Sequence, residues 1–176
     1  PRSTLFPYTT LFRSKLDVVL ADSPLPPSMD VRGYSHALGT STIGLYATPT
    51  LADALQGSFP ACLNGAPLLL PGAEASVRTP LLRWLETERL RPRIVGEFDD
   101  SALMRAFAEA GAGLFPSASL VGEQLCRQAG MVHLGDARGV TETYYAISVE
   151  RRLTHPAVRA ISEGAARHQL GGSTAD

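Results

Sequence analysis

A short acidic run is the feature of this sequence with the most evident chemistry. Glu97, Asp99 and Asp100 fall within the segment 96–101, GEFDDS, between a predicted strand and a predicted helix. Three carboxylates could supply oxygen ligands to a hard cation, or pair with the cationic group of a small molecule, with Phe98 beside them. Capping explains the same residues equally well: Asp99 or Asp100 would be the N-cap of the helix, and with Asp99 as the cap Asp100 would complement the helix dipole. The sequence leaves both interpretations open.

A second polar group stands where the preceding helix is expected to start. Ser76, Arg78 and Thr79 follow a strand that Pro71 and Gly72 interrupt. Hydroxyl and guanidinium groups at a helix start could hold an anionic or polar ligand. The alternative is an ordinary Ser76 N-cap and a solvated arginine. Ser117 offers the same choice, as a contact at a crossing between two lobes or as a helix cap.

The motifs of several catalytic and metal-binding classes are absent from the sequence. It contains no G-x-x-x-x-G-K-[ST], G-x-G-x-x-G, H-E-x-x-H or G-x-S-x-G pattern. The histidines lack the spacing of metal ligands, and the cysteines form no C-x-x-C pair; these residues are His36, His133, His155, His168, Cys62 and Cys126. We therefore expect a binding protein rather than an enzyme, in a reducing, cytoplasmic setting.

Residues 66–131 alternate between strand and helix patterns and must position the polar groups. The apolar spacing and the Pro and Gly breaks predict strands at 67–70, 93–96 and 113–115 and helices at 77–90, 99–110 and 117–129, with Gly111 and Gly130 as left-handed terminators. Leu81, Trp84, Leu85 and Phe107 are the predicted core. This β-α-β-α-β-α order predicts a parallel sheet, in which loops after the strands face one ligand crevice.

The flanking segments are harder to interpret. We expect strands at 16–21, 43–47, 131–134 and 144–149, a helical turn at 51–55, a helix from Pro156 and a disordered tail at 169–176. Residues 1–14 repeat Thr-Leu-Phe, resemble translated adapter sequence and are interpreted as non-native. The 176 residues have a formal charge of −1 and a mean hydropathy of +0.02, without an apolar run long enough to span a bilayer. Contact with DNA would therefore need a separate basic module.

These segments together resemble a known family. Residues 68–117 resemble the second lobe of the effector-binding domain of LysR-type transcriptional regulators. LDVVLADSP at 16–24 and HPAVRAI at 155–161 are similar to a strand of the first lobe and to the last helix of that domain. GEFDD, LLLPG and FPACL are most similar to the subgroup of sodium-responsive activators of sodium/proton antiporter genes.

The resemblance implies a type 2 periplasmic-binding-protein-like α/β fold that holds an effector between two lobes. Residues 66–131 would be lobe 2, residues 15–65 and 132–168 a truncated lobe 1, and the winged helix-turn-helix would be missing. Leu70 and Pro116 would lie at hinges. The effector side of lobe 2 would comprise Ser76, Arg78, Thr79, Phe98, Asp99 and Asp100, with Ser117 at the crossing.

The resemblance also implies a homo-oligomeric activator. It would bind DNA through the missing N-terminal module, have no membrane partner and need no cofactor, with a sodium ion as a candidate effector. The alternative is a periplasmic-type solute-binding protein, which shares the fold.

Overall fold

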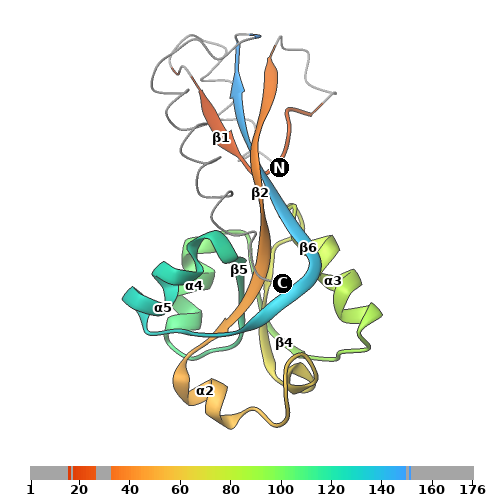
Figure 1. Ribbon diagram of the computed structural model, residues 1–176, viewed down its shortest axis with the longest axis vertical. Coiled ribbons are helices and arrows are strands. Elements are labelled where there is room, and N and C mark those ends of the chain that lie inside the picture. Colours follow the sequence, from red (N-terminus) through yellow and green to blue (C-terminus); the bar gives the residue numbers. More distant parts are fainter. Residues whose placement is uncertain (1–15, 17, 27–32, 150, 152–176) are drawn as a thin grey trace, which may run out of the picture. The chain divides into compact units, whose positions relative to one another are not determined.

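The computed structural model describes residues 16, 18–26, 33–149 and 151, which form parts of two compact units (Figure 1). One unit comprises Pro1–Thr40 and Thr143–Asp176, and the other comprises Ser41–Glu142. The expected helix from Pro156, the tail and residues 1–14 lie outside the described residues. None of the described helices is both long and apolar enough to cross a membrane.

The first unit contains a short antiparallel ladder. Strand β1 (Val19–Ala21) pairs with the end of β6 (Val132–Ser148), with Val19 opposite Ile147. Ile147 is fully buried and packs against Val19, Ala21, Leu25 and Tyr145. The predicted strand at 16–21 is thus shorter than expected, because pairing begins only at Val19.

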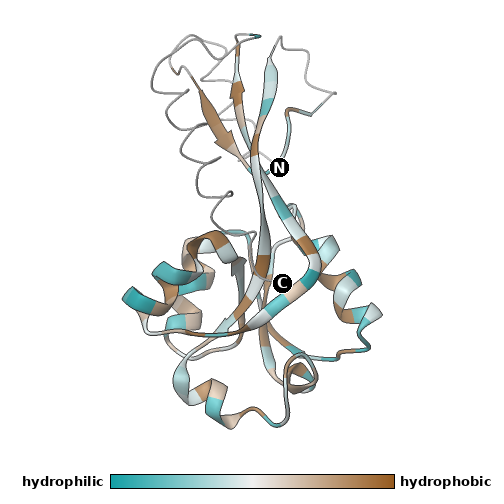
Figure 2. Cartoon of the chain, viewed as in Figure 1, coloured by the Kyte–Doolittle hydropathy of each residue, from teal (hydrophilic) through white to brown (hydrophobic). Residues whose placement is uncertain are grey.

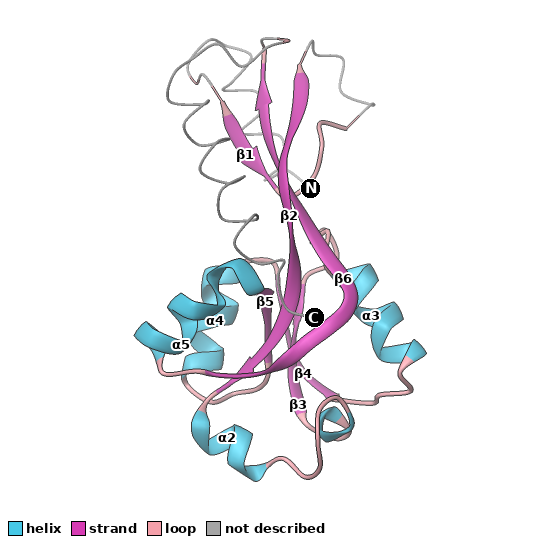
Figure 3. Ribbon diagram, in the orientation of Figure 1, coloured by secondary structure: helices cyan, strands magenta, loops and turns pink. Residues whose placement is uncertain are grey.

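The second unit carries the predicted alternation (Figure 3). Its central elements are β3 (Pro67–Pro71), α3 (Arg78–Thr87), β4 (Arg93–Phe98), α4 (Ser101–Glu109), β5 (Phe115–Ala118) and α5 (Gly122–Ala129). Strand β2 (Tyr34–Ala47) enters this unit and leads into α2 (Pro49–Ala54) and the 3-10 turn η1 (Ala61–Leu63), while a second 3-10 turn, η2 (Ser119–Val121), precedes α5. The β-α-β-α-β-α order is confirmed. The predicted lobe 2, residues 66–131, lies within this unit.

The strands of this unit are partly parallel and partly antiparallel. Strands β3 and β4 are parallel, and Leu114 forms a parallel bridge with Leu68. Strand β5 then pairs antiparallel with β2, where Phe115 lies opposite Tyr46. The carboxyl ends of β3, β4 and β5 consequently face the same edge of the unit, where the predicted binding residues begin.

The side chains of β3 point alternately to its two faces and pack into a hydrophobic core on each face. Leu69 packs with Met104 and Ala108 of α4 and with Leu125 of α5. Leu68 and Leu70 are also buried, and they point to the opposite face because successive strand residues alternate. Helix α3 covers that face (Figure 3) and buries Leu81, Trp84 and Leu85. Most residues of helix α5 are hydrophilic (Figure 2), and its buried residues are Gly122 and Leu125.

Both ends of α3 differ from the prediction. The helix stops at Thr87 rather than Leu90, because Arg89 adopts a left-handed conformation with φ 56° and Leu90 N–H donates to Leu85 C=O at 2.7 Å. The predicted Ser76 cap is wrong. Val77 occupies the N-cap position without a side-chain cap, and Arg78 N–H donates instead to Ala75 C=O.

Other predictions failed where sheet pairing overrides local signals. Ser117 does not cap a helix, because pairing with β2 extends β5 to Ala118. The predicted strands at 131–134 and 144–149 are one strand, β6, which runs through Gly135 and Gly139. Phe107 is 48% exposed rather than buried in the core, and its ring lies 5.2 Å from that of Phe98. Gly111 and Gly130 have positive φ and end α4 and α5 as predicted.

Candidate functional site

The two turns that carry the predicted effector residues lie side by side. Gly72 N–H donates to Phe98 C=O at 2.7 Å, just beyond the carboxyl ends of β3 and β4. A Cβ atom on Gly72 would lie 1.9 Å from Asp99 Oδ1 and 3.1 Å from Asp99 Cα, so the absence of a side chain at Gly72 leaves room for Asp99 at this close approach. The parallel pairing of β3 with β4 therefore brings the segments 72–79 and 96–101 together.

An ion pair joins the two turns. Arg78 donates to Glu97 Oε2 at 2.8 Å and to Pro71 C=O at 2.6 Å. The arginine side chain is 19% exposed and the glutamate side chain 57%. The hydrogen bond from Arg78, together with its charge, holds the pKa of the Glu97 carboxyl below its ordinary value. Arg78 thus links the two turns through its hydrogen bonds and is not a solvated side chain.

The structure decides between the two candidate caps of α4. Asp100 Oδ1 accepts from Leu103 N–H at 2.8 Å, which makes Asp100 the N-cap. Asp99, the other candidate, lies against Gly72 instead. The turns contain four carboxylates and a single guanidinium, Arg78, and so have an excess of negative charge; the carboxylates are Glu74, Glu97, Asp99 and Asp100.

The remaining predicted site residues differ in exposure and in their distance from the two turns along the fold. Ser76 and Thr79 are exposed at the start of α3, and Phe98 is half-buried at the end of β4. Ser117 is half-buried on β5, opposite Gly44 of β2. The end of β5 lies at the same edge of the unit as the turns, but Ser117 belongs to the β5–β2 strand pair, in a different sheet from β3 and β4.

The acidic run does not form a preassembled metal centre. In the part of the chain that the structure describes, no three His, Cys, Asp or Glu side chains are grouped as metal ligands would be. Glu97 is engaged by Arg78, and one oxygen of Asp100 is engaged by the helix. The role of Glu97, Asp99 and Asp100 toward a cation therefore stays a prediction.

One polar cluster escaped the sequence analysis. Asp136 Oδ1 accepts from Ser119 Oγ and lies beside His133 Nε2, both at 2.9 Å, and the Tyr46 ring is 5.0 Å from the His133 ring. Burial raises the pKa of Tyr46, and a hydrogen bond with Ser119 partly opposes that shift. The signal was hidden because these residues come from β2, η2 and β6 and share no motif. The small Gly44 and Gly122 leave room for the Tyr46 hydroxyl.

Comparison with known proteins identifies the family. Residues 9–169 match the LysR substrate binding domain. The chain belongs to this family. Among curated LysR relatives, it is 32% identical over 151 residues to the transcriptional activator protein NhaR of Escherichia coli strain K12, and equally so to NhaR of Shigella flexneri. The matched region covers 86% of the chain and 49% of either relative, so the chain spans about half their length.

Solved structures show the same fold. The LysR family regulator CbnR aligns with a TM-score of 0.64 at 15% identity, covering 90% of this chain and 54% of that one. Full-length LysG of Corynebacterium glutamicum with bound effector Arg gives 0.56 at 15% identity, covering 93% and 55%. The chain therefore has the type 2 periplasmic-binding-protein-like fold of LysR regulatory domains. Membership of this family favours a ligand-sensing domain of a regulator over a solute-binding protein.

Proposed function

We propose that this chain is the effector-sensing part of a cytoplasmic transcriptional activator, that it binds its effector without catalysis, and that sodium is the effector. The family match supports the effector-sensing role, and the similarity to NhaR supports a role in transcriptional activation. Sodium, and a sodium/proton antiporter gene as target, follow from the resemblance of GEFDD and FPACL to the sodium-responsive subgroup. DNA binding is assigned to an N-terminal module, and residues 15–65 with 132–168 are assigned to lobe 1 and 66–131 to lobe 2.

The paired turns are the proposed effector face of lobe 2. Ser76, Arg78 and Thr79 would contribute from the start of α3, and Phe98, Asp99 and Asp100 from the start of α4. The Gly72–Phe98 hydrogen bond and the Arg78–Glu97 ion pair support this assignment, because they hold both groups at one edge. Ser117 would contribute from β5. The excess of carboxylates there favours a cationic effector.

The proposed mechanism is a shift between two conformations. An effector shifts the equilibrium only if it binds one conformation more tightly than the other. Binding by the lobes would change their relative angle, and so the way a DNA-bound homo-oligomer sits on its promoter. The usual coupling between two linked sites is about 1–3 kcal/mol, which corresponds to roughly a 5- to 150-fold change in affinity.

The test uses the complete gene, because DNA and effector responses need the whole protein. Reporter expression from an antiporter promoter is measured in sodium and in equal potassium, for the wild type and for Asp99→Asn. Loss of the sodium response in Asp99→Asn supports the assignment. Glu86→Gln is the matched control, because Glu86 is exposed on the last turn of α3, away from the paired turns.

Three results would contradict parts of the proposal. An unchanged sodium response in Asp99→Asn would remove this carboxylate from the effector site. Equal responses to sodium and potassium in the wild type would exclude sodium as the specific effector. A complete protein that neither binds DNA nor changes reporter output would contradict the regulatory role itself.

A further inference from the structure

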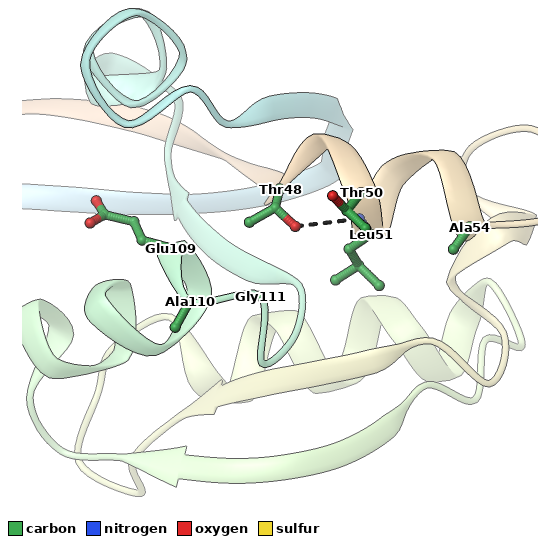
Figure 4. A pocket seen from close by; sticks show the side chains of 7 residues that line it. All are labelled: Thr48, Thr50, Leu51, Ala54, Glu109, Ala110 and Gly111. Atoms are coloured by element: carbon green, nitrogen blue, oxygen red, sulfur yellow. Dashed lines mark hydrogen bonds between the residues drawn. The ribbon is translucent and has the colours of Figure 1, made fainter.

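Ion pairs neutralise three arginines of the second unit. The pairs are Arg78–Glu97, Arg105–Glu109 and Arg127–Glu123. The second pair borders the pocket between α2 and the end of α4 (Figure 4), where Gly111 N–H and Ala112 N–H also occupy carbonyl groups near the end of the helix. The described lining of this pocket therefore offers no unpaired charge to a ligand.

The other arginines of this unit have no such partner, and most of them lie together. Throughout residues 41–142, which the structure describes without a gap, the arginines that make no ion pair or side-chain hydrogen bond are Arg83, Arg89, Arg91, Arg93 and Arg138. The first four are exposed at the end of α3 and the start of β4, and we call them the arginine patch. Residues 83–93 contain these four arginines and two glutamates, which gives a net charge of +2.

The backbone beneath Arg91 and Arg93 is held in place by the residues before β3. Gly65 N–H donates to Arg91 C=O at 3.0 Å, and Arg93 N–H donates to Ala66 C=O at 2.8 Å. Pro92 fixes its own φ and favours an extended Arg91. Residues two positions apart on an extended segment lie on the same side, roughly 6–7 Å from each other. The fold therefore sets out these two guanidinium groups as a row before any ligand binds.

Arg89 lies in a strained backbone conformation. Among the described residues it is the one other than glycine with positive φ, at 56°. Glycine adopts this left-handed conformation readily, whereas a Cβ atom is crowded there. The Arg89 guanidinium makes no ion pair or hydrogen bond within the described chain that could offset the strain. A strained, charged residue without a partner in its own fold indicates a role toward a partner outside it.

Strand β4 separates the arginine patch from the paired turns. The patch lies at the start of this six-residue strand and the paired turns at its end, roughly 16 Å away. Four carboxylates and one guanidinium give the turns a net charge of −3. The formal charge of −1 for the whole chain thus conceals a positive end and a negative end. At physiological salt the Debye length is about 8 Å, so the distant carboxylates are largely screened at the patch.

We infer that the arginine patch binds the phosphate backbone of double-stranded DNA without reading its sequence. Guanidinium groups donate paired hydrogen bonds to phosphate oxygens, and a row of them fits a polymer that carries a row of phosphates. Neutralising these phosphates releases condensed counterions, which favours duplex DNA over a single small anion. The contact goes beyond the proposed function, which assigns DNA binding to the N-terminal module, because it adds sequence-independent affinity from the sensing part itself.

The test measures binding of the chain to a fluorescent DNA duplex of arbitrary sequence by anisotropy. Potassium chloride is the salt, so the proposed sodium response plays no part. The wild type should bind at about 50 mM salt and lose affinity toward about 200 mM. Arg91→Gln combined with Arg93→Gln should weaken binding about tenfold or more. It should also reduce the steepness of log K against log salt by about 2, because each phosphate contact contributes about 0.9.

Arg89→Gly separates binding from stability. This variant should bind DNA more weakly, because it loses a guanidinium, and yet unfold at a higher Tm, because glycine relieves the positive φ. A residue with a purely structural role would not move the two measurements in opposite directions.

Arg105→Gln combined with Arg127→Gln is the matched control. It removes the same charge, but from exposed arginines that Glu109 and Glu123 already neutralise, so it should keep most of the wild-type affinity. The inference is overturned if the wild-type chain does not bind the duplex at about 50 mM salt, or if the two double variants lose equal affinity. It is also overturned if polyglutamate displaces the duplex at equal charge concentration, since the partner would then be an acidic protein.

Discussion

The Asp100 cap gives the sharpest test of how the candidate site is built. Asp100 Oδ1 accepts from Leu103 N–H at 2.8 Å, and the helix it starts buries Met104 and Ala108 in the core. Replacing Asp100 with Ala leaves that N–H without its partner and removes a negative charge from the positive end of the helix dipole. Loss of such a cap typically costs about 1 kcal/mol, within a range of about 0.5–2.

The assay is urea unfolding of the chain, with thermal unfolding as a second measure. For a chain of this length, a loss of about 1 kcal/mol lowers Tm by roughly 2–4 °C. Asp100→Asn should retain most of the stability, because asparagine caps helices as well as aspartate does. Asp99→Ala is the matched control, since this neighbouring carboxylate does not make the cap.

The pattern among the variants decides the matter. If Asp99→Ala costs as much as Asp100→Ala, the cap is wrongly assigned. If Asp100→Asn costs as much as Asp100→Ala, then charge rather than hydrogen bonding is what matters at this position. If the predicted pattern holds, Asp100→Asn removes the charge but keeps the helix cap. A changed effector response in this variant would then reflect the lost charge and not unfolding.

Three further predictions concern packing and pH. Glu97→Gln should destabilise the chain at neutral pH and match the wild type in acid. The pKa of Glu97 is lower in the folded chain than the value of 4.5 that applies to the unfolded chain, so its charged form stabilises the fold above pH 4.5, and this stabilisation is lost as the pH falls through the folded-state pKa. Stability measured as a function of pH should show the curves of the variant and the wild type merge in acid. Leu81→Ala should lower the free energy of unfolding by about 2–5 kcal/mol in urea, because Leu81 is fully buried. Leu82→Ala should change it by only about 0.5 kcal/mol, because Leu82 is 38% exposed. Equal losses in the two variants would contradict the orientation of α3. Gly122→Ala should cost about 1–3 kcal/mol, because the new Cβ would meet the buried Tyr46 hydroxyl, and the loss should shrink in a Tyr46→Phe background; an undiminished loss in that double variant would exclude this clash.

Local sequence signals determined most elements of the second unit. The three- and four-residue apolar spacing placed the buried face of α3, and Gly111 and Gly130 marked the ends of their helices because only a residue without a Cβ adopts positive φ readily. Alternation of strands and helices implied parallel pairing, and so implied that the residues after β3 and β4 would meet. That expectation is confirmed by the Gly72–Phe98 hydrogen bond.

Tertiary structure decided what depends on partners distant in the sequence. The sequence could not choose between Asp99 and Asp100 as cap, because both fit the local pattern and only the approach of Gly72 separates them. Strand β6 continues through Gly135 and Gly139 because long-range pairing outweighs local turn propensity. Tyr46, Ser119, His133 and Asp136 meet for the same reason: they come from β2, η2 and β6, three elements that lie close together only in the folded structure.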